Sequence, residues 1–211
     1  MPHSIIQRLT EHFIKFPGIG PRQARRFVYY LLQAEGVTVE KLLQDIKELR
    51  RVISRCGECY RFYPLAAVNK KNSPVCDLCQ DNSRDQTVLM LVEKDIDLES
   101  VEKAGVYRGH YFILGGLVPI LDTRPASRFR AKELLEKIQK QVKSHGLKEI
   151  IIALSANREG DNTVEFLKKF LEPAVTKYHL RLSVLGRGLS TGTELEYSDS
   201  ETLKSALKNR G

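Results

Sequence analysis

The sequence lacks long apolar segments. No apolar run approaches the roughly 18 residues that a membrane span requires, and residues 1–8 have no long apolar stretch of the kind found in a secretory signal. We therefore expect a cytoplasmic protein without a membrane association. Hydrophobic residues make up 42% and charged residues 28% of the 211 positions, which is ordinary for a globular chain and argues against wholesale disorder. This length predicts one or two domains with room for a small module.

Cysteine is scarce and occurs in one short stretch. The four cysteines form two Cys-x₂-Cys pairs with sixteen residues between them, namely Cys56, Cys59, Cys76 and Cys79. Two such turns supply four thiolates for a tetrahedral site with Zn–S distances of about 2.3 Å. Four sulfur ligands leave no position for a catalytic water. The spacing predicts one structural Zn²⁺ per chain, with four unrelated thiols or a redox pair as the alternatives.

Positive charge is concentrated near the N-terminus. Lysine and arginine total 34 against 26 acidic residues, a net charge of +8. Residues 1–55 carry 10 basic and 5 acidic side chains, so this quarter of the chain has a net charge of +5. A basic segment favours a polyanionic partner, because neutralising phosphates releases their condensed counterions. The alternative is a solvated basic face that aids solubility.

The same N-terminal segment has the pattern of three helices. Apolar positions predict helices over 5–14, from Pro21 to about Ala34 with Gly36 ending it, and from an N-cap at Thr38. The second helix should bury Ala24, Phe27, Val28, Leu31 and Leu32. The third should bury Leu42, Leu43, Ile46, Leu49 and Ile53.

The turn between the first two predicted helices reads Phe-Pro-Gly-Ile-Gly-Pro over 16–21. Glycine lets the backbone approach a phosphate closely, and the N-terminus of the following helix directs positive partial charge toward it. This is the form of a helix-hairpin-helix that contacts the DNA backbone without reading its sequence. An ordinary helical turn with surface arginines is the alternative. The predicted DNA-binding residues are Lys15, Gly18, Gly20, Arg22, Arg25 and Arg26.

From residue 87 the pattern changes to short apolar runs separated by helical segments. The predicted strands cover 88–92, 111–114, 150–154 and 180–185, and the helices between them cover 96–104, 129–145 and 161–171. Apolar runs of this kind are typical of strands buried on both faces. Their alternation with helices predicts an α/β domain with a mostly parallel sheet.

This layout resembles a Toprim domain. In catalytic Toprim enzymes, the first strand ends in a glutamate and a later strand is followed by Asp-x-Asp, and these acids bind Mg²⁺. Here Glu93 follows the first strand, but Ser155 and Asn157 occupy the two aspartate positions. A hydroxyl and an amide cannot replace two carboxylate charges around Mg²⁺. We interpret the domain as a scaffold that binds partners through Glu93 and Glu159. A weak metal site that includes Asp161, or simple helix capping, is the alternative.

The order of helix-hairpin-helix, four-cysteine zinc finger and Toprim-like domain resembles the RecR family of bacterial recombination mediators. The stretches at 16–22, 107–109, 114–116, 187–189 and 194–199 are similar to family motifs. The chain departs from the family pattern at Phe112, at Ser190 and in the basic segment 119–130. The corresponding domains are a helix-hairpin-helix domain over 1–55, a zinc finger over 56–86, a Toprim-like domain over 87–185 and a C-terminal assembly segment over 186–211.

This resemblance implies a multidomain α+β protein that is not an enzyme. Members form tetrameric rings that clamp double- and single-stranded DNA. They act with RecO, and in some bacteria RecF, to help load RecA onto single strands coated by single-strand binding protein during gap and break repair. No Gly-x₄-Gly-Lys-[Ser/Thr] P-loop is present, so we expect no nucleotide hydrolysis.

Two other functions compete with the mediator. A Mg²⁺-dependent Toprim nuclease or topoisomerase-like enzyme would need the missing aspartates, and a topoisomerase would also need a tyrosine nucleophile. Tyr29, Tyr30 and Tyr197 are expected to serve packing instead. A zinc-ribbon accessory protein of RNA metabolism is the other. The sequence leaves open whether residues 123–132, with three arginines, contact DNA.

Overall fold

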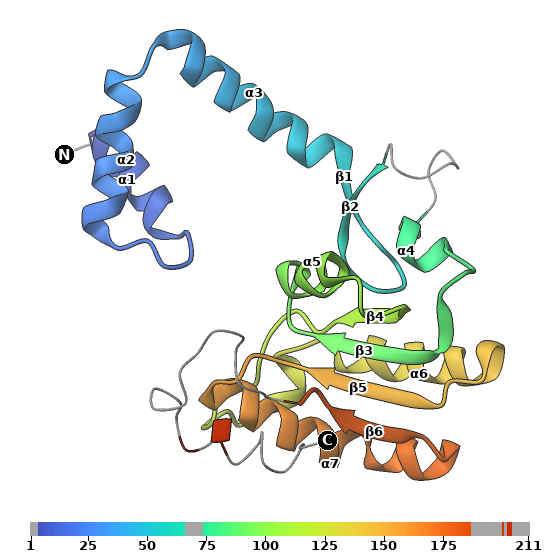
Figure 1. The fold of residues 1–211 in the computed structure, drawn as a ribbon. Helices are drawn as coiled ribbons and strands as arrows, with labels where there is room; N and C mark the ends of the chain where they lie inside the picture. The colour runs from blue at the N-terminus through green and yellow to red at the C-terminus, as the bar shows by residue number, and fades with distance from the viewer. Residues whose placement is uncertain (1–3, 66–73, 187–199, 201, 204–211) are drawn as a thin grey trace. The chain divides into compact units, whose positions relative to one another are not determined.

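The computed structural model describes residues 4–65, 74–186, 200 and 202–203. The chain divides into two compact units, Met1–Ile53 and Ser54–Gly211. Each is described by itself (Figure 1). No helix in the described ranges is long and apolar enough to cross a membrane.

The first unit begins with a helical hairpin. Helix α1 covers Ile5–Ile14, and Ser4 caps it by accepting a hydrogen bond from the Gln7 amide at 3.3 Å. Helix α2 covers Pro21–Gln33 and begins with a proline, whose fixed φ suits the first helical turn. The rings of Phe13 and Phe27 meet edge to face with centroids 5.6 Å apart. The helices lie at the residues that the sequence pattern predicts.

Helix α3 covers Gly36–Val52, and its start corrects the prediction. Gly36 is the first residue of α3 rather than the end of α2. Thr38 lies inside the helix, where its amide donates to the Glu35 carbonyl at 2.9 Å. The residues before Gly36 end α2, since Ala34 already has an extended backbone. Glycine is tolerated at this position because the amide groups of the first helical turn have no carbonyl partner within the helix.

Burial on α2 and α3 is also smaller than predicted. Ala24 and Val28 are buried, but Phe27 and Leu32 are exposed. Helix α3 contains no buried residue, and its apolar positions Leu42, Leu43, Ile46 and Leu49 are exposed. A helical repeat identifies which face of a helix is apolar, whereas burial also requires a neighbouring element to cover that face.

The second unit contains a four-stranded parallel sheet. Its strands are β3 (Asp85–Val92), β4 (Gly109–Ile113), β5 (Glu149–Ala153) and β6 (Arg181–Val184), in the spatial order β4-β3-β5-β6. All three pairings are parallel. The runs of buried apolar residues arise because helices cover both faces. This confirms the predicted parallel sheet.

Alternate residues of each strand supply two cores on opposite faces of the sheet. Leu89, Leu91 and Phe112 pack with side chains of α6 (Ala131–His145) and α7 (Arg158–Tyr178). Met90, Val92 and Tyr111 pack with Leu98 of α5 (Asp95–Ala104). Figure 1 shows α5 on one side of the sheet and α6 and α7 on the other. The strand periodicity of two therefore builds a three-layer unit.

The helix bounds differ modestly from the predicted ones. Helix α7 begins three residues early, because the Asn157 side chain accepts from the Gly160 amide at 2.8 Å and caps it. It also continues past Pro173 to Tyr178. Three short elements connect the helical unit to the parallel sheet along the chain, namely β1 (Ile53–Arg55), paired with β2 (Phe62–Pro64), and α4 (Asp77–Gln80). A short 3₁₀ turn covers Pro125–Ser127.

Candidate metal centre and nucleic-acid interface

The four cysteines come together at one point. Their sulfur atoms all lie within 4.8 Å of one another, and Cys59 Sγ is 3.6 Å from Cys76 Sγ. A tetrahedron with metal–sulfur bonds of about 2.3 Å has edges of about 3.8 Å, so this donor set fits a tetrahedral thiolate site. All four cysteines are free rather than paired as disulfides. Among the described residues they form the one group placed to bind a metal.

Backbone amides also donate hydrogen bonds to one of the sulfur atoms, as they do around metal-bound thiolates. The amides of Glu58 and Cys76 donate to Cys56 Sγ at 3.4 and 3.3 Å, as expected for a sulfur that carries negative charge. Hydrogen bonds from the other three thiols lower the pKa of Cys56. Hydrogen bonding to Cys56 raises the pKa of Cys59 and of Cys79. Four thiolates this close repel one another, and a bound divalent cation removes that conflict.

The first cysteine turn is docked on the edge strand β4. The Ile113 amide donates to the Cys59 carbonyl at 2.9 Å, which extends the sheet by one backbone bond. The Tyr60 ring meets Phe112 edge to face at 5.3 Å, and the Arg130 guanidinium lies 5.1 Å from the Tyr60 ring centroid. Tyr60 has a positive φ of 66°, a conformation that an aromatic residue rarely adopts unless its surroundings hold it. These contacts with the sheet therefore hold the first cysteine turn, and with it the candidate metal site, in place.

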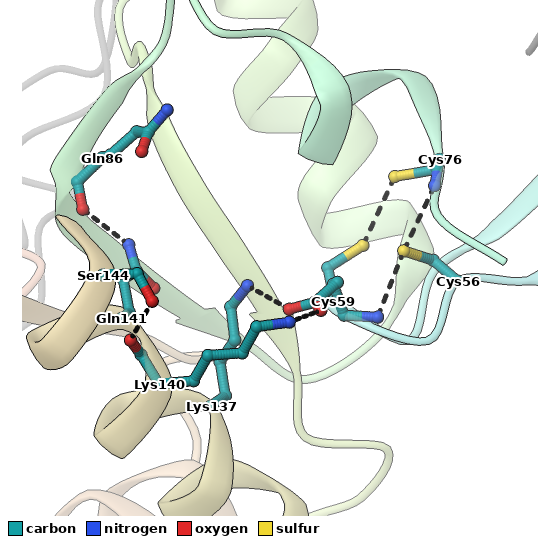
Figure 2. Close-up of polar contacts among 9 residues, drawn as sticks. Cys56, Cys59, Cys76, Gln86, Lys137, Lys140, Gln141 and Ser144 are labelled. Atoms are coloured by element: carbon teal, nitrogen blue, oxygen red, sulfur yellow. Dashed lines mark hydrogen bonds and ion pairs between the residues drawn. The ribbon is translucent and has the colours of Figure 1, made fainter. Parts of the chain in front are cut away.

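A second attachment joins the same turn to helix α6. Glu58 lies between the first two cysteines and forms ion pairs with Lys137, at 2.9 Å, and with Lys140. Figure 2 shows both lysines extending from α6 toward the turn that carries Cys59. Burial alone would raise the pKa of Glu58, but the hydrogen bonds from Lys140 and Lys137 outweigh it and lower that pKa. Sequence reasoning missed this contact, although an acid inside a Cys-x₂-Cys turn and lysines spaced i, i+3 were its available signals.

The predicted DNA-binding residues lie on the hairpin of the first unit. Gly18 has a φ of +76°, which explains the glycine there. Gly20 caps α2, and its amide donates to Gln23 Oε1 at 3.0 Å. Lys15 and the three arginines are exposed around the start of α2, where backbone amides concentrate positive partial charge. The structure thus brings these residues together on one short hairpin, and their DNA role stays a prediction.

Two tyrosines of α2 are exposed beside these arginines. Tyr29 is 49% and Tyr30 62% exposed, so the expectation that both serve packing is wrong within this unit. Arg22, Arg25 and Tyr29 line one groove of about 830 Å³ with residues of α1. Arg26 and Tyr30 line another hollow with Phe27. A helix presents residues three and four apart on one face, so Arg25 and Arg26 each have a tyrosine neighbour on α2. Tyr197 lies outside the described residues.

The residues at Toprim-like positions lie at one edge of the parallel sheet. Glu93 directly follows β3, and Ser155 and Asn157 follow the adjacent β5. The Asn157 side chain is occupied in capping α7. Glu159 is exposed in the first turn of α7, whereas Glu93 is partly buried and 3.9 Å from Lys94. In the described part of the chain, these acids and Asp161 do not form a metal-binding group.

The arginines of the basic segment have different surroundings. Arg130 donates to the Ile113 carbonyl at 2.8 Å and covers Tyr60, so it is committed to the fold. Arg128 pairs with Asp122, and Asp122 also accepts from the Arg124 amide at 2.7 Å. Arg124 is exposed. Arg130 therefore has a structural role, and any contact of this segment with nucleic acid would be made by its other residues.

Comparisons with known proteins agree along nearly the whole chain. The helix-hairpin-helix model of RecR matches residues 6–50, a Toprim domain model matches 87–185, and the C-terminal model of RecR matches 188–210. The Recombination protein RecR of Chloroflexus aurantiacus is 36% identical over 97% of this chain and 93% of its own length. That of Bacteroides thetaiotaomicron is 34% identical over 99% and 94%. The chain therefore belongs to the RecR family of recombination proteins.

Proposed function

We propose that this protein is a DNA-binding recombination mediator and not an enzyme. The observation that carries the proposal is the hairpin, where a glycine turn and three exposed arginines surround the N-terminus of α2. This arrangement presents both fixed partial charge and mobile guanidinium groups to a phosphate backbone. Lys15, Arg22, Arg25 and Arg26 hold the phosphates, and Gly18 and Gly20 keep the turn compact. Membership in a family of recombination proteins supports the same role.

The rest of the proposal concerns partners and the metal. The mediator binds double- and single-stranded DNA as a tetrameric ring and acts with RecO, and in some bacteria RecF, to help load RecA on strands coated by single-strand binding protein. Glu93 and Glu159, at the sheet edge after β3 and β5, contact the partner protein. The four cysteines hold one Zn²⁺ per chain, because zinc suits tetrahedral sulfur sites. Zinc in this position is structural, and it fixes the turn that carries Glu58 and Tyr60.

The double substitution Arg22→Ala with Arg26→Ala tests the hairpin. We expect at least a hundredfold loss of DNA affinity at 0.1 M salt, because each of the two arginines supplies a charge-assisted contact worth about 1.5–3 kcal/mol. The plot of log affinity against log salt concentration should become shallower, with the magnitude of its negative slope reduced by about 2, since two phosphates are no longer neutralised. Fluorescence anisotropy with a labelled duplex and a labelled single strand over a salt series measures both.

The matched control is Lys41→Ala with Lys47→Ala on α3, which removes the same charge from the same unit. This pair should leave the salt slope close to that of the wild type, and both double variants should keep the wild-type metal content. Equal losses in the two double variants would show a general charge effect rather than a hairpin site.

The alternative enzyme predicts cleavage of DNA. Incubation of the metal-loaded protein with Mg²⁺ and supercoiled plasmid should give no nicking above that of a Glu93→Gln control, because Ser155 and Asn157 lack the carboxylates that hold Mg²⁺. Gel electrophoresis of the plasmid reads the result. Plasmid cutting by the wild type that disappears in the Glu93→Gln variant would contradict the mediator proposal and show that the protein is a nuclease.

A further inference from the structure

A polar cavity of about 200 Å³ lies against the second cysteine turn. Its walls come from both cysteine turns, from the starts of β3 and β4, and from α6. The side chains that matter here are Glu58, His110, Lys137, Lys140, Gln141 and His145. No residue of the hairpin lines it, and it lies at the opposite ends of the parallel strands from the sheet edge that carries Glu93. A single buried water needs only about 10–15 Å³ of such space, so the cavity exceeds what one water fills.

Two buried polar atoms on this wall have no hydrogen-bond partner among the described residues. They are His110 Nε2 and Gln141 Oε1, on side chains that are only 8% and 3% exposed as whole residues. The orientation of the Gln141 amide is fixed, because its Nε2 donates to the Gln86 carbonyl at 2.7 Å (Figure 2). Reversing the amide would place two oxygens against each other. Buried polar groups are nearly always satisfied, so this pair indicates a missing polar partner.

Two ammonium groups in the cavity wall favour an anion. Lys137 and Lys140 pair with one carboxylate, Glu58, so one positive charge is left over among these three side chains, and the wall also includes Cys79 of the cysteine group. Burial, and after it the positive charges of Lys137 and Arg84, lower the pKa of His110 to about 4. The imidazole is therefore neutral at pH 7 and carries one N–H. Each lysine ammonium has three N–H groups, and one of them goes to Glu58.

We propose that this cavity binds a small phosphate that also carries a hydroxyl group. The ammonium groups of Lys137 and Lys140 and the His110 N–H donate to the phosphate oxygens. Gln141 Oε1 accepts from the hydroxyl, which a fully ionised oxyanion without a proton cannot supply. Inorganic hydrogen phosphate has this chemistry, and so does a nucleoside monophosphate through its sugar hydroxyl. The site is independent of DNA binding at the hairpin.

Calorimetric titration of the full-length, metal-loaded protein with inorganic phosphate at pH 7 tests the site. We expect saturable binding, with sulfate binding about tenfold more weakly because it offers no hydroxyl to Gln141. Lys140→Gln should weaken phosphate binding by about tenfold. Lys132→Gln is the matched control, since Lys132 lies on the same helix with its side chain 86% exposed and outside the cavity wall.

A second variant separates a binding role from a structural one. Glu58→Gln removes the acid that competes for both lysines, so it should tighten phosphate binding while Lys140→Gln weakens it. Metal content is measured for each variant, because Glu58 lies between two ligands. Opposite effects of the two variants support the site. Weakening by both, equal affinity for phosphate and sulfate, or no saturable binding would overturn it and leave the cavity to water.

Titration with deoxyadenosine 5′-monophosphate identifies the source of the phosphate. Tighter binding than inorganic phosphate, with the same loss in Lys140→Gln, supports a nucleotide site. Binding no tighter than that of inorganic phosphate supports a site for the free ion.

Discussion

Replacing Cys76 with serine should abolish metal binding and lower the melting temperature by about 10 °C or more. Cys76 is fully buried, and its Sγ lies 3.6 Å from Cys59 Sγ in the other turn, so the substitution removes one of the four ligands that hold the two turns together. Metal-binding energy in such modules is folding energy. A loss of about 4 kcal/mol corresponds to this shift, since 1 kcal/mol moves the transition by 2–4 °C in a protein of this size. Elemental analysis and scanning calorimetry measure the two effects.

Hydrogen exchange should show where order is lost. We expect faster exchange at residues 56–62 and at the Ile113 amide, which bonds to Cys59, but little change in α1 and α2. Wild-type protein treated with a chelator under reducing conditions is the control and should show the same pattern. A Cys76→Ser variant that keeps one equivalent of metal, or a wild type with four titratable thiols and unchanged exchange, would refute the metal centre.

Gly160→Ala should destabilise the protein by about 4 kcal/mol or more. A Cβ atom at Gly160 would lie 1.9 Å from the Ser155 carbonyl oxygen, which is backbone and cannot rotate away. The clash also disturbs Asn157, whose side chain caps α7 through the Gly160 amide. Glycine to alanine within a helix normally stabilises by up to about 1 kcal/mol, so the expected sign is reversed. Urea unfolding with a fixed m-value measures the change in free energy.

Gly36→Ala is the matched control for this prediction. Gly36 is also in the first turn of a helix, has no positive φ, and would have nothing within 4 Å of an added Cβ. This variant should be neutral or slightly stabilising. If Gly160→Ala is equally harmless, the close approach between the start of α7 and the loop after β5 does not exist in solution.

Local patterns in the sequence were sufficient for most helices and strands. The apolar runs at 88–92 and 150–154 are buried on both faces, and this left parallel pairing as the simplest arrangement. The pattern was insufficient at Gly36, because a glycine is compatible with the end of one helix or the first turn of the next. It was also insufficient for the apolar face of α3, since periodicity does not reveal what covers a face. For the same reason the pattern predicts packing for Tyr29 and Tyr30, which are exposed.

Some features of the candidate sites could likewise be predicted from local sequence patterns, and others could not. The cysteine group could be predicted because its four ligands come in two pairs whose spacing carries the chemistry. The pairing of Glu58 with Lys137 and Lys140 could not, because 79 and 82 residues separate these partners. The same holds for Arg130, whose position over Tyr60 depends on how two distant turns meet. Contacts of this range are set by the packed fold and leave little local trace in the sequence.

Strand β4 forms one border of the sheet, and every residue in it is buried. Such an apolar edge is a template for pairing with another chain unless something blocks it. In this protein the block is the cysteine turn, through the bond from Ile113 to Cys59 and the Tyr60 ring. We therefore expect a chain that has lost its metal to expose this strand before it unfolds, and to aggregate more readily than the metal-loaded protein.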